Sequence, residues 1–296
     1  MKILICSDGT PPADSAIRLG GLLAGASRAE TTLLGITEKP ANERSLRDAL
    51  EAQAQAQSLR AAGVVPEIVV RAGEPIRQIL KQTLTTTYDL VVIGSRPRRT
   101  TGFYWRSRRT YEVVKSIPLP VLVAIGECTR LKKFLVCTGG KEFIADAVEL
   151  TGRLAAAAGA SVTLLHVMAE PPAMYADLMR LEEDVNQLLE SHSELGINLR
   201  GQKEELERFG VPTEVHVRHG LVLFQVLAET RTGDYDLIVT GSSKARGVIR
   251  HYIMGDLTRS ILNHANCSVL VVRAGQPART EGFWDFLKQL FRHRQS

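Results

Sequence analysis

The sequence predicts an α/β protein made of two tandem, open-twisted parallel sheets of five strands, each flanked by helices. One observation is a repeat: the apolar run Tyr88–Ser95 returns as Tyr235–Ser242, and both runs end in Gly-Ser. The other is the alternation of strand-length apolar runs with helical patterns through both halves of the chain. Such alternation indicates parallel strands joined by right-handed crossovers, with helices on both faces of the sheet.

The repeat keeps its spacing within the predicted elements. Cys6 and Cys137 are 131 residues apart, whereas Gly94 and Gly241 are 147 apart. The spacing therefore changes only in the connections, as expected of a tandem duplication. We divide the chain into a first domain (1–128), a second domain (129–275) and a basic amphipathic C-terminal tail (276–296).

Each domain is predicted to hold five strands. Those of the first domain are expected near 2–7, 31–37, 66–71, 89–93 and 120–124, with helices near 12–28, 42–62, 74–87 and 107–116. Those of the second are expected near 133–138, 161–167, 213–218, 236–240 and 268–272. A longer helix is expected over 174–209, with one apolar stripe that faces the core or a protein partner.

Composition bounds the class of protein. Hydrophobic residues make up 44% and charged residues 23% of the chain, as in soluble globular proteins. No apolar run approaches the roughly 20 residues that cross a bilayer, and the N-terminus lacks the layout of a signal peptide, so we expect a cytoplasmic protein. The four cysteines show no Cys-x-x-Cys spacing, and no metal site is expected.

The net charge of +5 has a local origin. Six arginines lie in one loop without an intervening acidic residue: Arg96, Arg98, Arg99, Arg106, Arg108 and Arg109. They carry more than the whole net charge, so the rest of the chain is nearly neutral. This pattern indicates a near-neutral protein with one basic loop, which either binds an anion or forms a solvated face, and we do not expect a nucleic-acid-binding protein.

Several segments together resemble the universal stress protein family, here as two domains in one chain. The first-strand segment Ile3–Gly9 resembles that of the family, as do the second-strand segments Thr31–Thr37 and Ser161–Val167. The segment Asn266–Val272 resembles the family's last strand. The resemblance implies a Rossmann-like fold of the HUP type with strand order 3-2-1-4-5. The repeat of five strands predicts two separate sheets related by an approximate twofold axis, and the resemblance implies that the last strands, near 120–124 and 268–272, lie together at the junction.

The resemblance further implies an ATP site. In the family, a Gly-x2-Gly-x9-Gly-Ser/Thr loop cradles the phosphates, and an Asp at the end of the first strand contacts the adenosine. Glycines suit such a loop because they let backbone N–H groups approach an anion closely. Asp8 matches this aspartate in the first domain, and Gly139 stands in its place in the second.

Both loops depart from the family's pattern. In the first, Pro97 replaces a glycine and has no N–H to donate, while Arg108 replaces the Ser or Thr. In the second, Lys244 replaces a glycine and Asp256 the Ser or Thr, which places a carboxylate near any phosphate. The candidate nucleotide- or anion-binding residues are Asp8, Gly94, Ser95, Arg96, Arg106, Arg108, Gly241, Ser242, Gly247 and Gly255.

We therefore expect a tandem universal stress protein that is a non-enzymatic stress-response binding or signalling module with degenerate adenine-nucleotide sites. No catalytic motif stands near either loop. We expect at most weak binding of ATP or another adenine nucleotide. The alternatives are an ATP-binding protein that keeps a weak site, an ATPase or adenylyl transferase, and an interaction protein that holds an acidic partner through the loop 96–109.

Two segments offer further surfaces. Besides the helix over 174–209, the tail 282–296 carries apolar residues at helical spacing together with basic residues. It is expected to dock on its own domains or on a protein partner. Contact with an anionic membrane surface is the less favoured alternative, because the tail is short and carries few cations.

Overall fold

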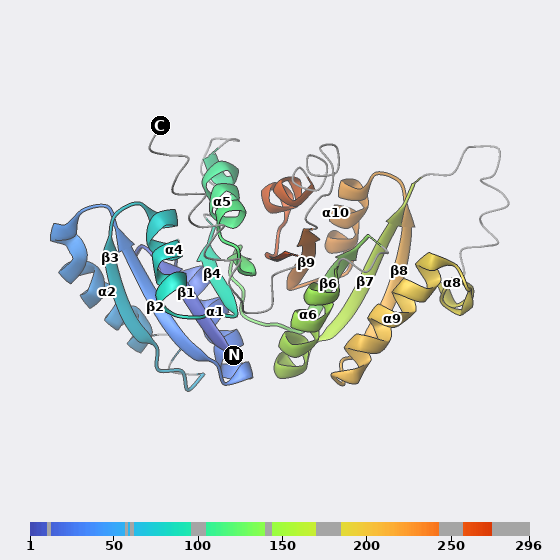
Figure 1. The fold of residues 1–296 in the computed structure, drawn as a ribbon, viewed down its shortest axis with the longest axis horizontal. Helices are drawn as coiled ribbons and strands as arrows, with labels where there is room; N and C mark the ends of the chain where they lie inside the picture. The colour runs from blue at the N-terminus through green and yellow to red at the C-terminus, as the bar shows by residue number, and fades with distance from the viewer. Residues whose placement is uncertain are drawn as a thin grey trace.

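The computed structural model describes residues 1–10, 13–56, 59, 62–95, 105–139, 144–169, 185–242 and 257–273. Within them the chain forms a ten-stranded sheet with helices on both faces (Figure 1). The strands follow the order β3-β2-β1-β4-β5-β10-β9-β6-β7-β8. Each half therefore has the predicted order 3-2-1-4-5, and the α/β class is confirmed.

The first half supplies five parallel strands. They are β1 (Lys2–Ser7), β2 (Glu30–Thr37), β3 (Glu67–Ala72), β4 (Leu90–Gly94) and β5 (Val121–Ala124). The helical elements are α1 (Asp14–Ser27), η2 (Pro40–Asn42), α2 (Glu43–Ala56), α4 (Pro75–Thr85) and α5 (Trp105–Ser116). Strands β1, β4 and β5 are buried along nearly their whole length, as expected of parallel strands covered on both faces.

The second half repeats this plan. Its strands are β6 (Lys133–Thr138), β7 (Ser161–Met168), β8 (Thr213–His219), β9 (Leu237–Ser242) and β10 (Ser268–Arg273). Its helices are α6 (Ala145–Ala158), α8 (Val185–Glu190), α9 (Glu194–Arg208) and α10 (Val222–Thr232), and residues 257–264 are also helical.

The two halves meet through their last strands. Strand β10 pairs antiparallel with β5, and Leu270 lies opposite Leu122. Val269 faces Val123 and Val271 faces Val121, so equivalent residues exchange places about this central pair. The register therefore has the twofold symmetry that the sequence predicted for the junction. The last strands lie together, as expected.

The expectation of two separate sheets is wrong, because the β5–β10 ladder joins them into one. An isolated last strand would leave a row of backbone N–H and C=O groups unpaired. The antiparallel ladder satisfies them, and the Ser268 hydroxyl accepts a further bond from the Ile125 N–H at 3.2 Å. Backbone pairing of this kind leaves no residue-specific signal in a sequence.

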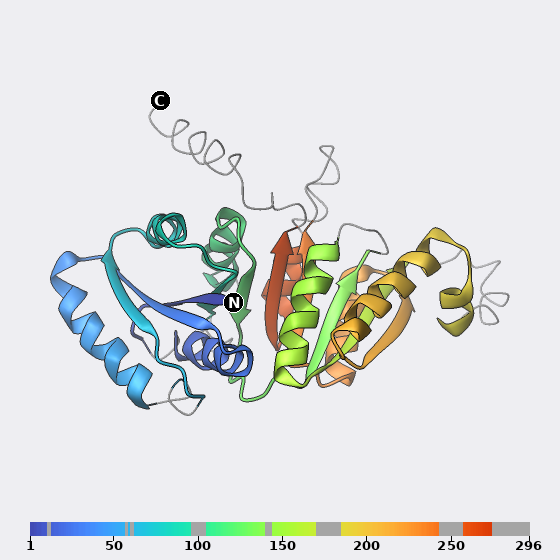
Figure 2. The same cartoon turned by 60° about the horizontal axis from the view of Figure 1, so that its bottom comes forward.

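The helices form two layers, and each layer runs across both halves. One buried cluster joins α1 and α2 to α6 and α9 on one face of the sheet (Figure 2). The other joins α4 and α5 to α10 and the helical residues 257–264 on the opposite face. Helix α1 packs against α6, and the Arg259 guanidinium lies over the Tyr111 ring at 5.8 Å. Both buried clusters thus extend across the two halves.

The helix expected over 174–209 is interrupted. Helix α8 ends at Glu190 and α9 begins at Glu194, while residues 170–184 lie outside the described part of the chain. The Ser193 hydroxyl accepts from the Gly196 N–H at 3.0 Å, which caps a new helix start. The described part of the apolar stripe faces the core, since Val185, Leu188, Leu189 and Leu195 pack against the first cluster.

Arg273 ties the second half to the first, and its removal tests this junction. Its guanidinium donates to the carbonyls of Val114, at 2.7 Å, and of Lys115, in the last turn of α5. We expect Arg273→Met to lower the free energy of unfolding by about 1.5–3 kcal/mol, because charged hydrogen bonds to helix carbonyls are lost. Urea denaturation measures this. Arg153→Met, on the exposed side of α6, is the matched control. Equal losses for both variants would contradict the prediction.

Candidate functional site

The direction of chain progression across the sheet changes between β1 and β4 in the first half. It changes between β6 and β9 in the second. In open parallel sheets, ligands bind beyond the carboxyl ends of the strands at such a switch point. Five of the ten candidate residues lie there, in the turn after β1 and at the ends of β4 and β9: Asp8, Gly94, Ser95, Gly241 and Ser242. These five residues therefore lie at the edge of the sheet where a ligand is expected, and their binding of a ligand remains a prediction.

Asp8 lies in an ordered turn at the carboxyl end of β1. Its Oδ1 accepts from the Thr10 backbone N–H at 3.0 Å and from the Thr10 hydroxyl at 2.5 Å. The Gly9 N–H donates to the Ser7 hydroxyl at 3.1 Å. The turn is therefore fixed by its own hydrogen bonds, while the Asp8 side chain stays exposed. An exposed, oriented carboxylate can accept hydrogen bonds from the hydroxyl groups of a ligand.

Ser95 is less available than the sequence suggested. It is buried, and its backbone N–H donates to the Ala124 carbonyl at 2.9 Å. Gly94 pairs with Ala124 in the β4–β5 ladder. The Gly-Ser pair therefore ends a strand, and the Ser95 amide is already used within the sheet. Of the first-half candidates, Asp8 is the described side chain that reaches solvent.

The arginine candidates lie partly outside the description. Arg96 falls in 96–104, which the structure leaves undescribed. Arg106 and Arg108 are in the first turn of α5, where the backbone is described and the side chains are not. The sequence prediction that these residues bind an anion remains a prediction.

The equivalent switch point of the second half, between β6 and β9, carries different residues. Gly241 and Ser242 end β9, where they pair with Val272 and Arg273 of β10. Gly247 and Gly255 lie in 243–256, outside the described residues. Gly139 follows β6 at the place of Asp8, and a Cβ built on it would meet no atom of the described residues within 4 Å. The backbone at Gly139 therefore tolerates a side chain, and the missing carboxylate is not imposed by the fold.

His166 lies beside this second switch point. Its Nδ1 is 3.0 Å from the Thr138 carbonyl at the end of β6, and the residue is partly buried. Burial lowers the pKa of His166 below its usual range, against the opposing effect of the Thr138 bond. The imidazole is therefore neutral near pH 7 and donates from Nδ1 to the carbonyl. His166 is therefore a packed histidine that holds the end of β6.

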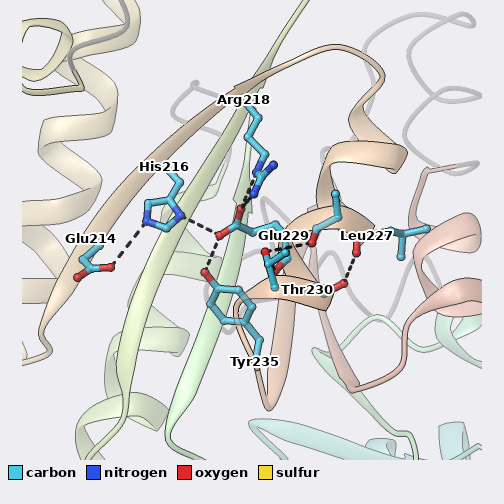
Figure 3. A network of polar contacts seen from close by, with 9 residues as sticks. Glu214, His216, Arg218, Leu227, Glu229, Thr230 and Tyr235 are labelled. Atoms are coloured by element: carbon cyan, nitrogen blue, oxygen red, sulfur yellow. Dashed lines mark hydrogen bonds and ion pairs between the residues drawn. The ribbon is translucent and has the colours of Figure 1, made fainter.

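Helix α10 carries a buried carboxylate, that of Glu229, which contacts side chains of β8 (Figure 3). Glu229 is 3% exposed, and its oxygens accept from His216 at 2.8 Å, from Arg218 Nε at 2.5 Å and from the Tyr235 hydroxyl at 2.9 Å. Burial alone would raise the pKa of Glu229, but these three hydrogen bonds together lower it. Glu214 also lies 3.7 Å from His216. Glu229 is therefore an ionised, fully engaged group.

The first half contains an equivalent network with an amide in place of the carboxylate. Gln82 occupies the place of Glu229, accepts from Arg71 at 2.8 Å and donates to the Tyr88 hydroxyl at 2.9 Å. Tyr88 in turn donates to Thr32 at 3.0 Å. Each network joins the third strand, the helix after it and the residue before the fourth strand. We conclude that it is a structural brace common to both halves rather than a ligand site.

Sequence reasoning missed this brace, although a signal was present. The 147-residue spacing that relates Gly94 to Gly241 also relates Gln82 to Glu229 and Tyr88 to Tyr235. Aligning polar residues as well as glycines at that spacing would have exposed it.

The thiols of the described residues are unreactive, and no metal-binding cluster is found among these residues. Burial raises the pKa of Cys6, Cys137 and Cys267 to about 12, so these thiols are protonated near pH 7. The described residues contain no cluster of His, Cys, Asp and Glu that could hold a metal ion. Nor does any helix among them have the length and apolar character needed to span a membrane.

Replacing Glu229 with Gln tests the brace and its acid dependence. A carboxylate with a lowered pKa stabilises the fold above its unfolded pKa of about 4.3, and this contribution is lost as the pH falls through the folded pKa. We expect Glu229→Gln to lower the free energy of unfolding by about 1–3 kcal/mol at pH 7. The difference from the parent protein should shrink below about pH 4.

Urea denaturation at a series of pH values measures this. Glu149→Gln, which alters an exposed carboxylate, is the control and should change little at any pH. A Glu229→Gln effect that is constant from neutral to acid pH would contradict the assignment.

Comparison with known proteins adds the family relation. The model of the universal stress protein family matches residues 1–124 and 130–273. No curated protein matches the chain significantly. Among solved structures, a universal stress protein from Archaeoglobus fulgidus DSM 4304 is similar over 93% of this chain and 98% of its own, with 20% identity and a TM-score of 0.66.

A putative universal stress protein from Pseudomonas aeruginosa UCBPP-PA14 is similar over 92% of this chain and 93% of its own, with 14% identity and a TM-score of 0.68. A universal stress protein in complex with cAMP matches 48% of this chain and 97% of its own, with 19% identity and a TM-score of 0.35. The first two matches extend over both halves of the chain, and the third over about one half.

Proposed function

Because the chain belongs to the universal stress protein family, we propose that it is a cytoplasmic, non-enzymatic binding and signalling module of the stress response. In this proposal its two adenine-nucleotide sites are degenerate and unequal. The first half keeps weak binding of ATP or a related anion, and the second half has lost most of it.

The observation that carries the proposal is the difference between Asp8 and Gly139. Both follow the first strand of their half at the switch point, but only Asp8 offers a carboxylate. The resemblance to the family gives this aspartate the contact with adenosine. Loss of one such hydrogen-bonded contact weakens binding by about 1–3 kcal/mol, or roughly five- to 150-fold.

In the first half, arginine side chains rather than backbone N–H groups would bind the phosphates. Pro97, which stands at the second glycine of the family's loop, has no N–H to donate, and the amide of the neighbouring Ser95 is bonded to Ala124. Guanidinium groups bind phosphate in a bidentate manner, and each charge-assisted bond contributes about 1.5–3 kcal/mol. Ordering each long side chain opposes this by about 1.5–2 kcal/mol. Affinity should therefore be modest, salt-sensitive and greatest for highly charged ligands.

A non-enzymatic role is supported by the ionisable groups of the described residues, which are held in structural contacts or are protonated near neutral pH. The buried Glu229 is held by three hydrogen bonds within the brace. The cysteines with raised pKa values are weak nucleophiles near neutral pH. Prolonged incubation with ATP should therefore yield no ADP or AMP above the uncatalysed rate.

The arginine contribution can be measured directly. We expect Arg96→Ala, Arg106→Ala and Arg108→Ala in one protein to weaken the binding of ATP and of inorganic triphosphate by about tenfold or more at low salt, because three cations are removed. Calorimetry at two salt concentrations gives the affinities. The control removes the same charge elsewhere, through Arg44→Ala, Arg77→Ala and Arg153→Ala on exposed helix surfaces.

Equal binding of ATP and inorganic triphosphate by the two triple variants would contradict the proposal that arginines of the first half bind phosphate. A panel of ATP, AMP, cyclic nucleotides and polyanions in the same experiment separates the alternatives. Tight binding of acidic polymers without nucleotide binding would favour an interaction protein. Micromolar or tighter binding of ATP would favour a functional nucleotide site.

Gly139→Asp tests the role of the missing carboxylate. Because the position is sterically open, we expect the variant to fold and to bind ATP about tenfold more tightly in the second half, through one restored hydrogen-bonded contact. Inorganic triphosphate should not gain affinity, since it has no adenosine. Gly201→Asp on α9, also sterically open, is the matched control. Unchanged or weaker ATP binding by Gly139→Asp would contradict the proposal that a carboxylate at this position, as at Asp8, contacts the adenosine.

A further inference from the structure

Three large apolar side chains lie exposed where β8 passes into α10. Leu221, Val222 and Phe224 are 71%, 41% and 69% exposed. We call these three residues the α10 patch. They lie at the end of α10 that follows β8, an outer edge strand of the sheet (Figure 1). Single exposed apolar residues are ordinary, whereas three within four consecutive residues indicate a surface that something covers.

The first half shows that the fold does not need this patch. The equivalent turn has the same backbone, since Gly73 has φ +132° and Gly220 has φ +121°. There, however, the Glu74 carboxylate caps α4 by accepting from the N–H groups of Ile76 and Arg77, at 3.0 and 2.8 Å. A side-chain cap of this kind stabilises a helix start.

The second half has replaced that arrangement with apolar residues. Leu221 stands at the place of Glu74 and Phe224 at that of Arg77, and α10 has no side-chain cap. A helix cap and a charged residue have thus given way to exposed hydrophobic surface. A change that removes a stabilising contact and adds exposed apolar area points to binding rather than to folding.

The chain itself contains a segment suited to this patch. After β10 ends at Arg273, the tail carries apolar residues at helical spacing: Phe283, Trp284, Phe286, Leu287, Leu290 and Phe291. This spacing gives one apolar face, with Lys288 and Arg292 elsewhere. Such a face needs a hydrophobic surface against which to pack.

The tail is long enough to reach. Strands β10, β9, β6, β7 and β8 are parallel neighbours, so Arg273 and the start of α10 lie at the same edge of the sheet. Four strand spacings of about 4.8 Å separate them by roughly 19 Å. Ten residues from Arg273 to Phe283 can span up to about 33–36 Å. Tethering over this distance gives an effective concentration on the order of millimolar, which favours the chain's own tail over a separate partner.

We infer that the α10 patch is the docking surface for the C-terminal tail of the same chain, with Phe283–Phe291 packed as an amphipathic helix over Leu221 and Phe224. The tail then covers the start of α10 and leaves its basic residues at the surface. This inference is independent of nucleotide binding, because none of its residues belongs to either switch point.

Fluorescence of Trp284 in the full-length protein tests the inference. The chain has two tryptophans, so Trp105→Phe leaves Trp284 as the single reporter. In the docked state its emission should be blue-shifted and shielded from acrylamide. Phe224→Glu, Leu221→Glu or Leu287→Glu should shift the emission to the red and raise acrylamide quenching roughly twofold or more, because the indole loses its apolar contact.

Val65→Glu is the control, since Val65 is an exposed apolar residue of the first half. It should leave the emission unchanged. The shielding should also persist over roughly two decades of protein concentration, because dilution does not weaken an intramolecular contact. Emission that is insensitive to both patch variants would overturn the inference.

Two further outcomes would also overturn it. Shielding that disappears on dilution would assign the patch to a second copy of the chain. An emission shift that occurs only after vesicles of phosphatidylserine and phosphatidylcholine are added would assign the tail to a membrane surface.

Discussion

The antiparallel pairing of β5 with β10 is the constraint on which the rest of the structure depends. It turns the last strand of each half from an exposed edge into an interior strand, and it fixes the twofold relation through the Leu122–Leu270 pair. Both helical layers then continue across the junction, so the apolar residues of the two halves form shared clusters. Separating the halves would expose those clusters as well as the strand edges, and we therefore expect the halves to unfold together.

Within this symmetric frame, equivalent positions have acquired different chemistry. The brace has the amide of Gln82 at its centre in the first half and the carboxylate of Glu229 in the second, yet it connects the same elements in both halves. Asp8 and Gly139 differ at equivalent turns after the first strand. The architecture is thus preserved where residues hold strands and helices together, and it has diverged where side chains face a ligand or solvent.

Much of the fold was predictable from the sequence, because buried parallel strands are apolar runs and helices show a 3.6-residue period. The bounds of β1 and β6 agree with the prediction, and the other strands are shifted by one or two residues. The joined sheet was not predictable, since it depends on backbone groups that every residue carries. The break before Ser193 was missed because the apolar stripe continues through it. For the site, glycine spacing located Gly94 and Gly241, but it could not reveal that the Ser95 amide is already bonded to Ala124.

The linkage of the two halves in one chain also fixes their stoichiometry. In a dimer of identical subunits, every substitution appears twice, and the assembly dissociates on dilution. Here the pairs Gln82/Glu229, Asp8/Gly139 and Glu74/Leu221 show that one half has changed without the other. A polypeptide of this kind always presents one copy of each version, at any cellular abundance, so each half is free to specialise under its own selection.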